Sequence, residues 1–202
     1  MDNALVRRKE KKIISGYNKL AEMISAHKVL GKKIIFLSGT FDMFHIGHCR
    51  YFLSAIEAVA EKTSKGREDI VLVVGVDSDD EVRMRKGPYR PVVSQDERAE
   101  VVAYDEDVDY VIIKEEKEFN WNLAQTIRAD FIILSESTNV IYEGGREKMI
   151  EDIKEWAEDV FVLPPQAETS TTGRIHKLIT EKLADARVRI NSIFDELLGG
   201  KQ

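Results

Sequence analysis

The sequence predicts an α/β protein with a Rossmann-like, doubly wound parallel sheet and long N- and C-terminal helices. Two observations lead to this fold class. Short apolar runs, typical of buried strands, alternate with segments whose apolar residues recur at helical spacing. The outermost segments at both ends of the chain are also amphipathic. Right-handed crossovers between parallel strands would place helices on both faces of the sheet.

Each element follows from a local pattern. The first helix is expected from Ile13 onward, because apolar residues recur at helical spacing at Ile13, Ile14, Tyr17, Leu20, Ala21 and Ile24. Unbroken apolar runs predict buried strands at 34–39, 69–77, 108–114, 130–135 and 159–163. Between them, helices are expected at 47–62, 78–85, 121–128 and 145–157, and one more begins after Ser94. The Ser94 hydroxyl can cap that helix.

The C-terminal segment has an apolar stripe that something must cover. Its members recur at helical spacing and are Ile175, Leu178, Ile179, Leu183, Ile190, Ile193, Phe194 and Leu197. They indicate one long helix or two. Packing within the chain and formation of a homodimer both remain open. The expected organisation is a helical extension over 1–32, a central α/β domain over 33–180 and a second helical extension over 181–202.

Composition narrows the class of protein. A chain of 202 residues suits one domain, and its net charge of -6 argues against general nucleic-acid binding. No apolar run approaches the roughly 20 residues that span a bilayer, and no signal peptide is evident, so no membrane partner is expected. The single cysteine, Cys49, excludes an internal disulfide framework and a multi-cysteine metal site. We therefore expect a cytoplasmic protein.

The loop after the first strand carries the strongest chemical signal. Gly39 lets the backbone approach a ligand, and the loop ends at the amino end of a helix, which favours phosphate. His45 and His48 are three residues apart, so both can face one side. Imidazole donors together with Mg²⁺ can stabilise charge on the α-phosphate of a nucleoside triphosphate and on departing pyrophosphate. A zinc pair is the alternative, but no third ligand has a recognisable spacing.

These residues resemble the cytidylyltransferase-like nucleotidyltransferase superfamily, whose mark is G-T-F-D followed by H-x-G-H. The chain has both halves, as 39–42 and 45–48. The superfamily's second mark, a serine and threonine pair that opens a late helix, is similar to the segment 169–174. The resemblance covers about residues 33–180. It includes glycerol-3-phosphate cytidylyltransferases and the nucleotidyltransferase domain of ADP-heptose synthases.

The resemblance implies transfer of a nucleoside monophosphate from ATP or CTP to a phosphorylated small molecule, with release of pyrophosphate. The acceptor class would be a sugar phosphate or polyol phosphate. The implied catalytic residues are His45, His48 and Lys86. The nucleotide-binding residues would be Gly39, Thr40, Phe41, Asp42, Gly47, Ser170, Thr171, Thr172 and Arg174. The substrate-binding residues would be Asp77, Asp79, Arg90 and Arg98, with Arg83 and Arg85 as weaker phosphate contacts. No metal site built by the protein is expected, because the nucleotide phosphates would hold Mg²⁺.

Several roles of these residues, and more than one function, stay open. Asp77 and Asp79 can bind an acceptor or instead cap the helix at 78–85. The glycerol-phosphate type has an arginine in an R-Y-V-D-E-V stretch, where this chain has E-D-V-D-Y-V at 106–111. The fourth strand leads into S-E-S-T at 135–138 rather than a glycine and aspartate pair. The missing arginine favours the adenylyl-transferring members, but the fourth-strand segment departs from those members as well. The choice of base and acceptor therefore stays open, and the two departures also admit a nucleotide-binding sensor without catalysis. A helical scaffold is a third hypothesis.

Overall fold

The computed structural model describes residues 11–114, 121–137, 142–168 and 171–199. It divides the chain into two compact units, Met1–Gln166 and Ala167–Gln202. The first unit holds a parallel sheet covered by helices, and the second holds one long helix.

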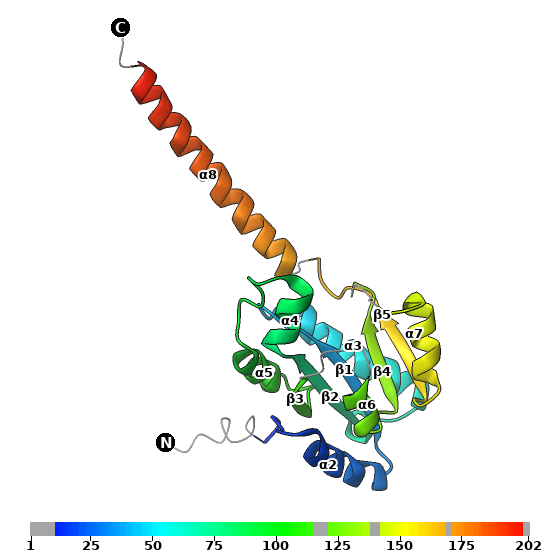
Figure 1. Ribbon diagram of the computed structural model, residues 1–202. Coiled ribbons are helices and arrows are strands. Elements are labelled where there is room, and N and C mark those ends of the chain that lie inside the picture. The colour runs from blue at the N-terminus through cyan, green and yellow to red at the C-terminus, as the bar shows by residue number, and fades with distance from the viewer. Residues whose placement is uncertain (1–10, 115–120, 138–141, 169–170, 200–202) are drawn as a thin grey trace, which may run out of the picture. The chain divides into compact units, whose positions relative to one another are not determined.

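Five strands form the sheet within the described residues (Figure 1). They are β1 (Lys33–Gly39), β2 (Ile70–Asp77), β3 (Tyr110–Lys114), β4 (Phe131–Ser135) and β5 (Asp159–Leu163). All neighbours pair in parallel, in the order β3-β2-β1-β4-β5. The predicted doubly wound parallel sheet is confirmed. The strand order reverses between β1 and β4, and in such sheets ligands bind beyond the carboxyl ends of the strands at that point.

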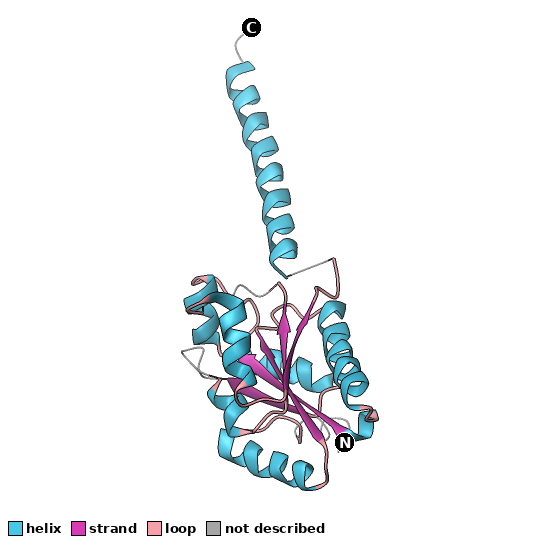
Figure 2. Ribbon diagram, turned by 90° about the vertical axis from the view of Figure 1, so that its right-hand side faces the viewer, coloured by secondary structure: helices cyan, strands magenta, loops and turns pink. Residues whose placement is uncertain are grey.

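Helices cover both faces of the sheet (Figure 2). One face packs against α3 (Ile46–Thr63) and α5 (Gln95–Tyr104). The other packs against α2 (Tyr17–Val29), α6 (Asn122–Thr126) and α7 (Gly145–Lys154). The short helices η1 (Arg67–Asp69) and α4 (Asp79–Lys86) lie before and after β2 in the chain.

The central positions of β1 and β2 are apolar one after another because both faces of the sheet are buried there. In β1, Ile35 and Leu37 enter the core beneath α3, while Ile34 and Phe36 enter the core on the opposite side. This alternation is the two-residue period of a strand. The sequence therefore shows continuous apolar runs rather than alternating ones.

The expectation that the first helix begins near Ile13 is wrong. Ile13 instead forms a parallel bridge to Val111 at the edge of the sheet, and the Ile14 N–H donates to the Val111 carbonyl at 2.9 Å. Gly16, whose φ is +89°, then turns the chain into α2. The apolar residues at 13 and 14 are buried by the sheet and not by a helix face.

Serine side chains begin the two helices that follow β2. The Ser94 hydroxyl accepts a hydrogen bond from the Glu97 N–H and caps α5, as predicted. The Ser78 hydroxyl accepts from the Glu81 N–H at 3.2 Å and caps α4. The capping role considered for Asp77 and Asp79 therefore belongs to Ser78.

The second unit contains α8 (Thr171–Gly199), a single helix of 29 residues. The C-terminal stripe thus lies on one helix and not two. Among the described residues, no helix combines the length and apolarity that crossing a membrane requires.

Candidate active site

The G-T-F-D loop leaves the carboxyl end of β1 through two left-handed residues. Phe41 and Met43 have φ values of 51° and 49°. The Phe41 ring folds back over Gly39, where a Cβ would lie only 3.1 Å from the ring. Phe41 is buried and meets the His48 ring edge to face, with centroids 5.4 Å apart. A side chain at position 39 would press on the Phe41 ring, which in turn packs against His48.

The two histidines stand at the amino end of α3 with their rings stacked 4.0 Å apart. His45 is the N-cap, and its Nδ1 accepts from the Gly47 N–H at 3.1 Å. Nδ1 of His48 accepts from the His45 N–H at 3.2 Å. Because each Nδ1 is an acceptor, this hydrogen-bond network assigns the proton of each neutral ring to Nε2. Both imidazoles can therefore donate through Nε2 to an anion at the helix end.

Thr40 connects the first loop to α4. Its hydroxyl donates to a carboxylate oxygen of Asp77 at 3.2 Å and accepts from the Lys86 ammonium at 3.0 Å. Burial, followed by the positive charges of Arg85 and Arg90, lowers the pKa of Lys86. The structure thus brings Thr40, Asp77 and Lys86 together beside the β1 and β2 ends.

Asp42 ties the first loop to the segment that follows Lys86. Its buried carboxylate accepts from the Arg90 guanidinium at 2.9 Å. It also accepts from the backbone N–H groups of Val92 and Val93, each at 3.1 Å from Oδ1. Asp42, predicted to bind the nucleotide, and Arg90, predicted to bind the substrate, thus form a contact between two loops.

Arg98 on α5 is the most deeply buried charged side chain of this region, with 1% of its surface exposed. Its guanidinium donates to the Thr40 carbonyl, to the Asp77 carbonyl at 2.8 Å and to the Asp79 carboxylate at 2.7 Å. Its Nε donates to the Val93 carbonyl at 2.9 Å. Arg98 joins the ends of β1 and β2 to the start of α5.

Sequence reasoning missed Glu81 and Lys114. The Lys114 ammonium, at the end of β3, donates to Glu81 at 3.0 Å and lies 3.4 Å from Asp77. Arg85 pairs with the same Asp77 carboxylate. Burial, followed by the nearby charge of Asp77, raises the pKa of Glu81. The sequence could have indicated Lys114, because this lysine ends an apolar strand and the carboxyl ends of parallel strands meet at one edge of the sheet.

The structure does not test the second motif. Ser170 lies outside the described residues, and the side chains of Thr171 and Thr172 are not described. Arg174 is exposed on α8. These residues belong to the second unit, so their place beside the histidines stays a prediction.

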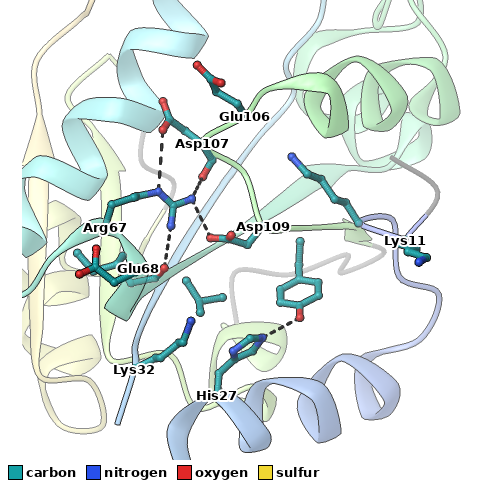
Figure 3. Close-up of a pocket in the computed structure, with 12 residues that line it drawn as sticks. Lys11, His27, Lys32, Arg67, Glu68, Glu106, Asp107 and Asp109 are labelled. Carbon is teal, nitrogen blue, oxygen red and sulfur yellow. Dashed lines mark hydrogen bonds and ion pairs between the residues drawn. The ribbon is translucent and has the colours of Figure 1, made fainter. Parts of the chain in front are cut away.

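A cavity of about 780 Å³ lies at the opposite, amino edge of the sheet (Figure 3). Arg67 donates there to the Asp107 carbonyl at 2.7 Å and to the Asp109 carboxylate at 3.1 Å. His27 shares a 2.8 Å hydrogen bond with Tyr110, and burial lowers the pKa of His27. The acidic side chains that line this cavity offset the positive charge of its lysines. The departure at 106–111 therefore falls away from the carboxyl ends of the strands.

Two further features concern metals and thiols. Within the described residues there is no group of three histidine, cysteine, aspartate or glutamate side chains that could hold a metal ion. At the carboxyl edge, Asp42, Asp77 and Asp79 each pair with an arginine. Burial raises the pKa of the Cys49 thiol to about 11, and so disfavours the reactive thiolate.

Comparisons with known proteins show the family to which the chain belongs. A family model described as cytidylyltransferase-like matches residues 36–193. The chain is 31% identical over 163 residues to the bifunctional protein HldE of Geobacter sulfurreducens, covering 81% of this chain and 31% of that protein. It is 32% identical over 164 residues to HldE of Aliarcobacter butzleri, again covering 81% and 31%. The chain thus spans less than a third of these relatives.

A solved structure, the lipopolysaccharide core biosynthesis protein from Thermoplasma volcanium GSS1, is similar with a TM-score of 0.49 and 17% identity. The match covers 68% of this chain and 98% of that one.

We predict that Arg98→Lys lowers the free energy of unfolding by about 3–5 kcal/mol, because the carbonyls and carboxylate around a buried guanidinium lose donors. Urea unfolding of the two proteins measures the change. Arg83→Lys is the matched control, since Arg83 is half-exposed and should change stability by less than about 0.5 kcal/mol. Equal losses of unfolding free energy in both variants would contradict the role of Arg98 in joining the ends of β1 and β2 to α5.

Proposed function

Because the chain belongs to the cytidylyltransferase-like family of nucleotidyltransferases, we propose that it transfers a nucleoside monophosphate to a small phosphorylated molecule. ATP or CTP would be the donor, and a sugar phosphate or polyol phosphate the acceptor. An acceptor phosphate oxygen attacks the α-phosphorus, forming a new P–O bond while the bond to pyrophosphate breaks. The similarity to the HldE proteins supports a sugar phosphate first.

The observation that carries this proposal is the hydrogen bonding of the histidine pair at the start of α3. Nδ1 of each ring accepts a backbone N–H, so Nε2 is the donor in both rings. The pair begins α3, whose amino end adds a partial positive charge. Donors fixed before the reaction stabilise charge that develops on the transferred phosphate and on pyrophosphate.

Lys86 adds a positive charge beside these donors. Its ammonium is fixed on the Thr40 hydroxyl at 3.0 Å, beside the loop that ends in the histidines. We assign it to the triphosphate, where it would offset charge as pyrophosphate leaves. The backbone of Gly39 and Thr40 would lie against the α-phosphate, and Gly47 contributes to the amino end of α3.

The outer phosphates are assigned to the start of α8. Ser170, Thr171 and Thr172 would offer hydroxyl and N–H groups at a helix amino end, and Arg174 a positive charge. Mg²⁺ would arrive bound to the triphosphate, because the carboxylates of the carboxyl edge are paired with arginines and do not form an ion site of their own.

The four residues predicted to bind substrate are better explained as positioning residues. Asp77 and Asp79 hold Arg85, Lys114 and Arg98, while Arg90 holds Asp42. These contacts support a role in fixing the loops around the nucleotide. The protein would work in the reducing cytoplasm as a homodimer, on small molecules and without nucleic acid.

We predict that His48→Ala lowers kcat by about 10²–10³-fold, because one Nε2 donor to the transition state is lost. Pyrophosphate release with ATP or CTP and a panel of sugar and polyol phosphates measures turnover. His27→Asn, at the amino edge, is the matched control and should keep wild-type turnover, and melting curves should show both variants folded.

Unchanged turnover in folded His48→Ala would contradict the assignment. Nucleotide binding by the wild type, with no pyrophosphate release from any acceptor, would favour the sensor hypothesis instead.

We predict that kcat/KM falls on the alkaline side at a pH below 10.5, the ordinary pKa of lysine, because the lowered pKa of Lys86 lets its ammonium lose a proton earlier. A pH–rate profile measures this limb. In Lys86→Arg the limb should move to higher pH, since arginine stays charged. An identical alkaline limb in both proteins would exclude Lys86 as its source.

A further inference from the structure

Part of the C-terminal stripe, together with Ala186, follows a coiled-coil spacing on α8. Ile179, Leu183, Ala186, Ile190 and Ile193 succeed one another at intervals of four and three residues. The sequence continues this spacing to Leu197, so apolar residues recur every 3.5 residues over nearly three heptads. In this register Ile179, Ala186 and Ile193 occupy d positions, and Leu183 and Ile190 occupy a positions.

These side chains are exposed within the structure. Their exposed fractions are 53% for Ile179, 66% for Leu183, 52% for Ile190 and 56% for Ile193. The helix is amphipathic, so most of its stability in water must come from packing of the apolar face. An uncovered heptad stripe of this length favours pairing with another helix that carries the same spacing.

The stripe is complementary to itself when a second copy runs in the opposite direction. The intervals from 179 to 197 read four, three, four, three, four, the same in both directions. Leu183 then lies opposite Ile193 of the second copy, and the small Ala186 lies opposite the larger Ile190. A two-fold axis passes near residue 188. An isologous dimer requires this self-complementarity.

The parallel orientation fits less well. It would place Ala186 against Ala186, leaving a gap in the middle of the seam. The antiparallel orientation places Ala186 opposite Ile190 and so avoids that gap.

We propose that two copies of this chain form a homodimer through an antiparallel coiled coil of their α8 helices, with Ile179, Leu183, Ala186, Ile190 and Ile193 as the seam. The occupant of the stripe is a second copy of this chain. The seam begins at Ile179, after the first turn of α8 that is assigned to the outer phosphates, so the oligomeric state can be tested separately from turnover.

Sedimentation equilibrium of the full chain tests the interface. The wild type should have twice the 23.1 kDa mass of the chain, and Ile190→Glu should sediment as a monomer with its sheet domain still folded. Val188→Glu is the matched control, because Val188 is 69% exposed at an f position on the outer side of the seam. It should remain a dimer. A monomeric wild type, or a dimer that Ile190→Glu leaves intact, would overturn the proposal.

Cross-linking tests the orientation, in a Cys49→Ser background. Ala186→Cys and Ile190→Cys chains that carry different tags are mixed and oxidised. The antiparallel seam places positions 186 and 190 of opposite chains within disulfide range, so the mixed disulfide should predominate. Disulfides confined to Ala186→Cys pairs would show a parallel coiled coil and contradict the proposed orientation.

Discussion

The carboxyl edge of this protein depends on one buried guanidinium. Arg98 is almost fully excluded from water, and a buried charge is tolerated only where acceptors surround it. Those acceptors come from the loop after β1, the end of β2 and the segment before α5. The three segments must therefore converge on α5 before the side chain can be buried. This convergence also fixes Thr40, and through it the position of Lys86.

The charged groups around Arg98 form two layers. The inner layer pairs aspartates with arginines, as in Asp42 with Arg90 and Asp79 with Arg98, and it fixes loops. The outer layer contains the donors suited to a phosphate: the Nε2 groups of His45 and His48 and the Lys86 ammonium. The acidic side chains of the inner layer lower the net charge of the edge. A chain with a net charge of -6 can thus present a phosphate site.

Much of the fold could be predicted from the sequence, because strands buried on both faces must be continuously apolar and helices must show their own period. Ile13 and Ile14 fit a helical period equally well, and only their pairing with Val111 shows that they belong to the sheet. The histidines lie where their motif predicted, at the start of α3. The partners of Asp42, Asp77 and Arg98 lie far away in sequence, so local patterns could not show that these charges bind one another. Lys114 was missed for the same reason.

The proposed function depends on binding of a nucleoside triphosphate at the carboxyl edge. Melting curves of the wild type with Mg²⁺ and each of ATP, CTP, GTP and UTP test this binding most directly. We expect stabilisation by ATP or CTP, of about 2.7 kcal/mol at a concentration one hundred times Kd. We also expect a smaller shift in Lys86→Ala, which removes a phosphate-binding cation. No shift with any triphosphate, with sugar phosphates absent or present, would contradict this binding.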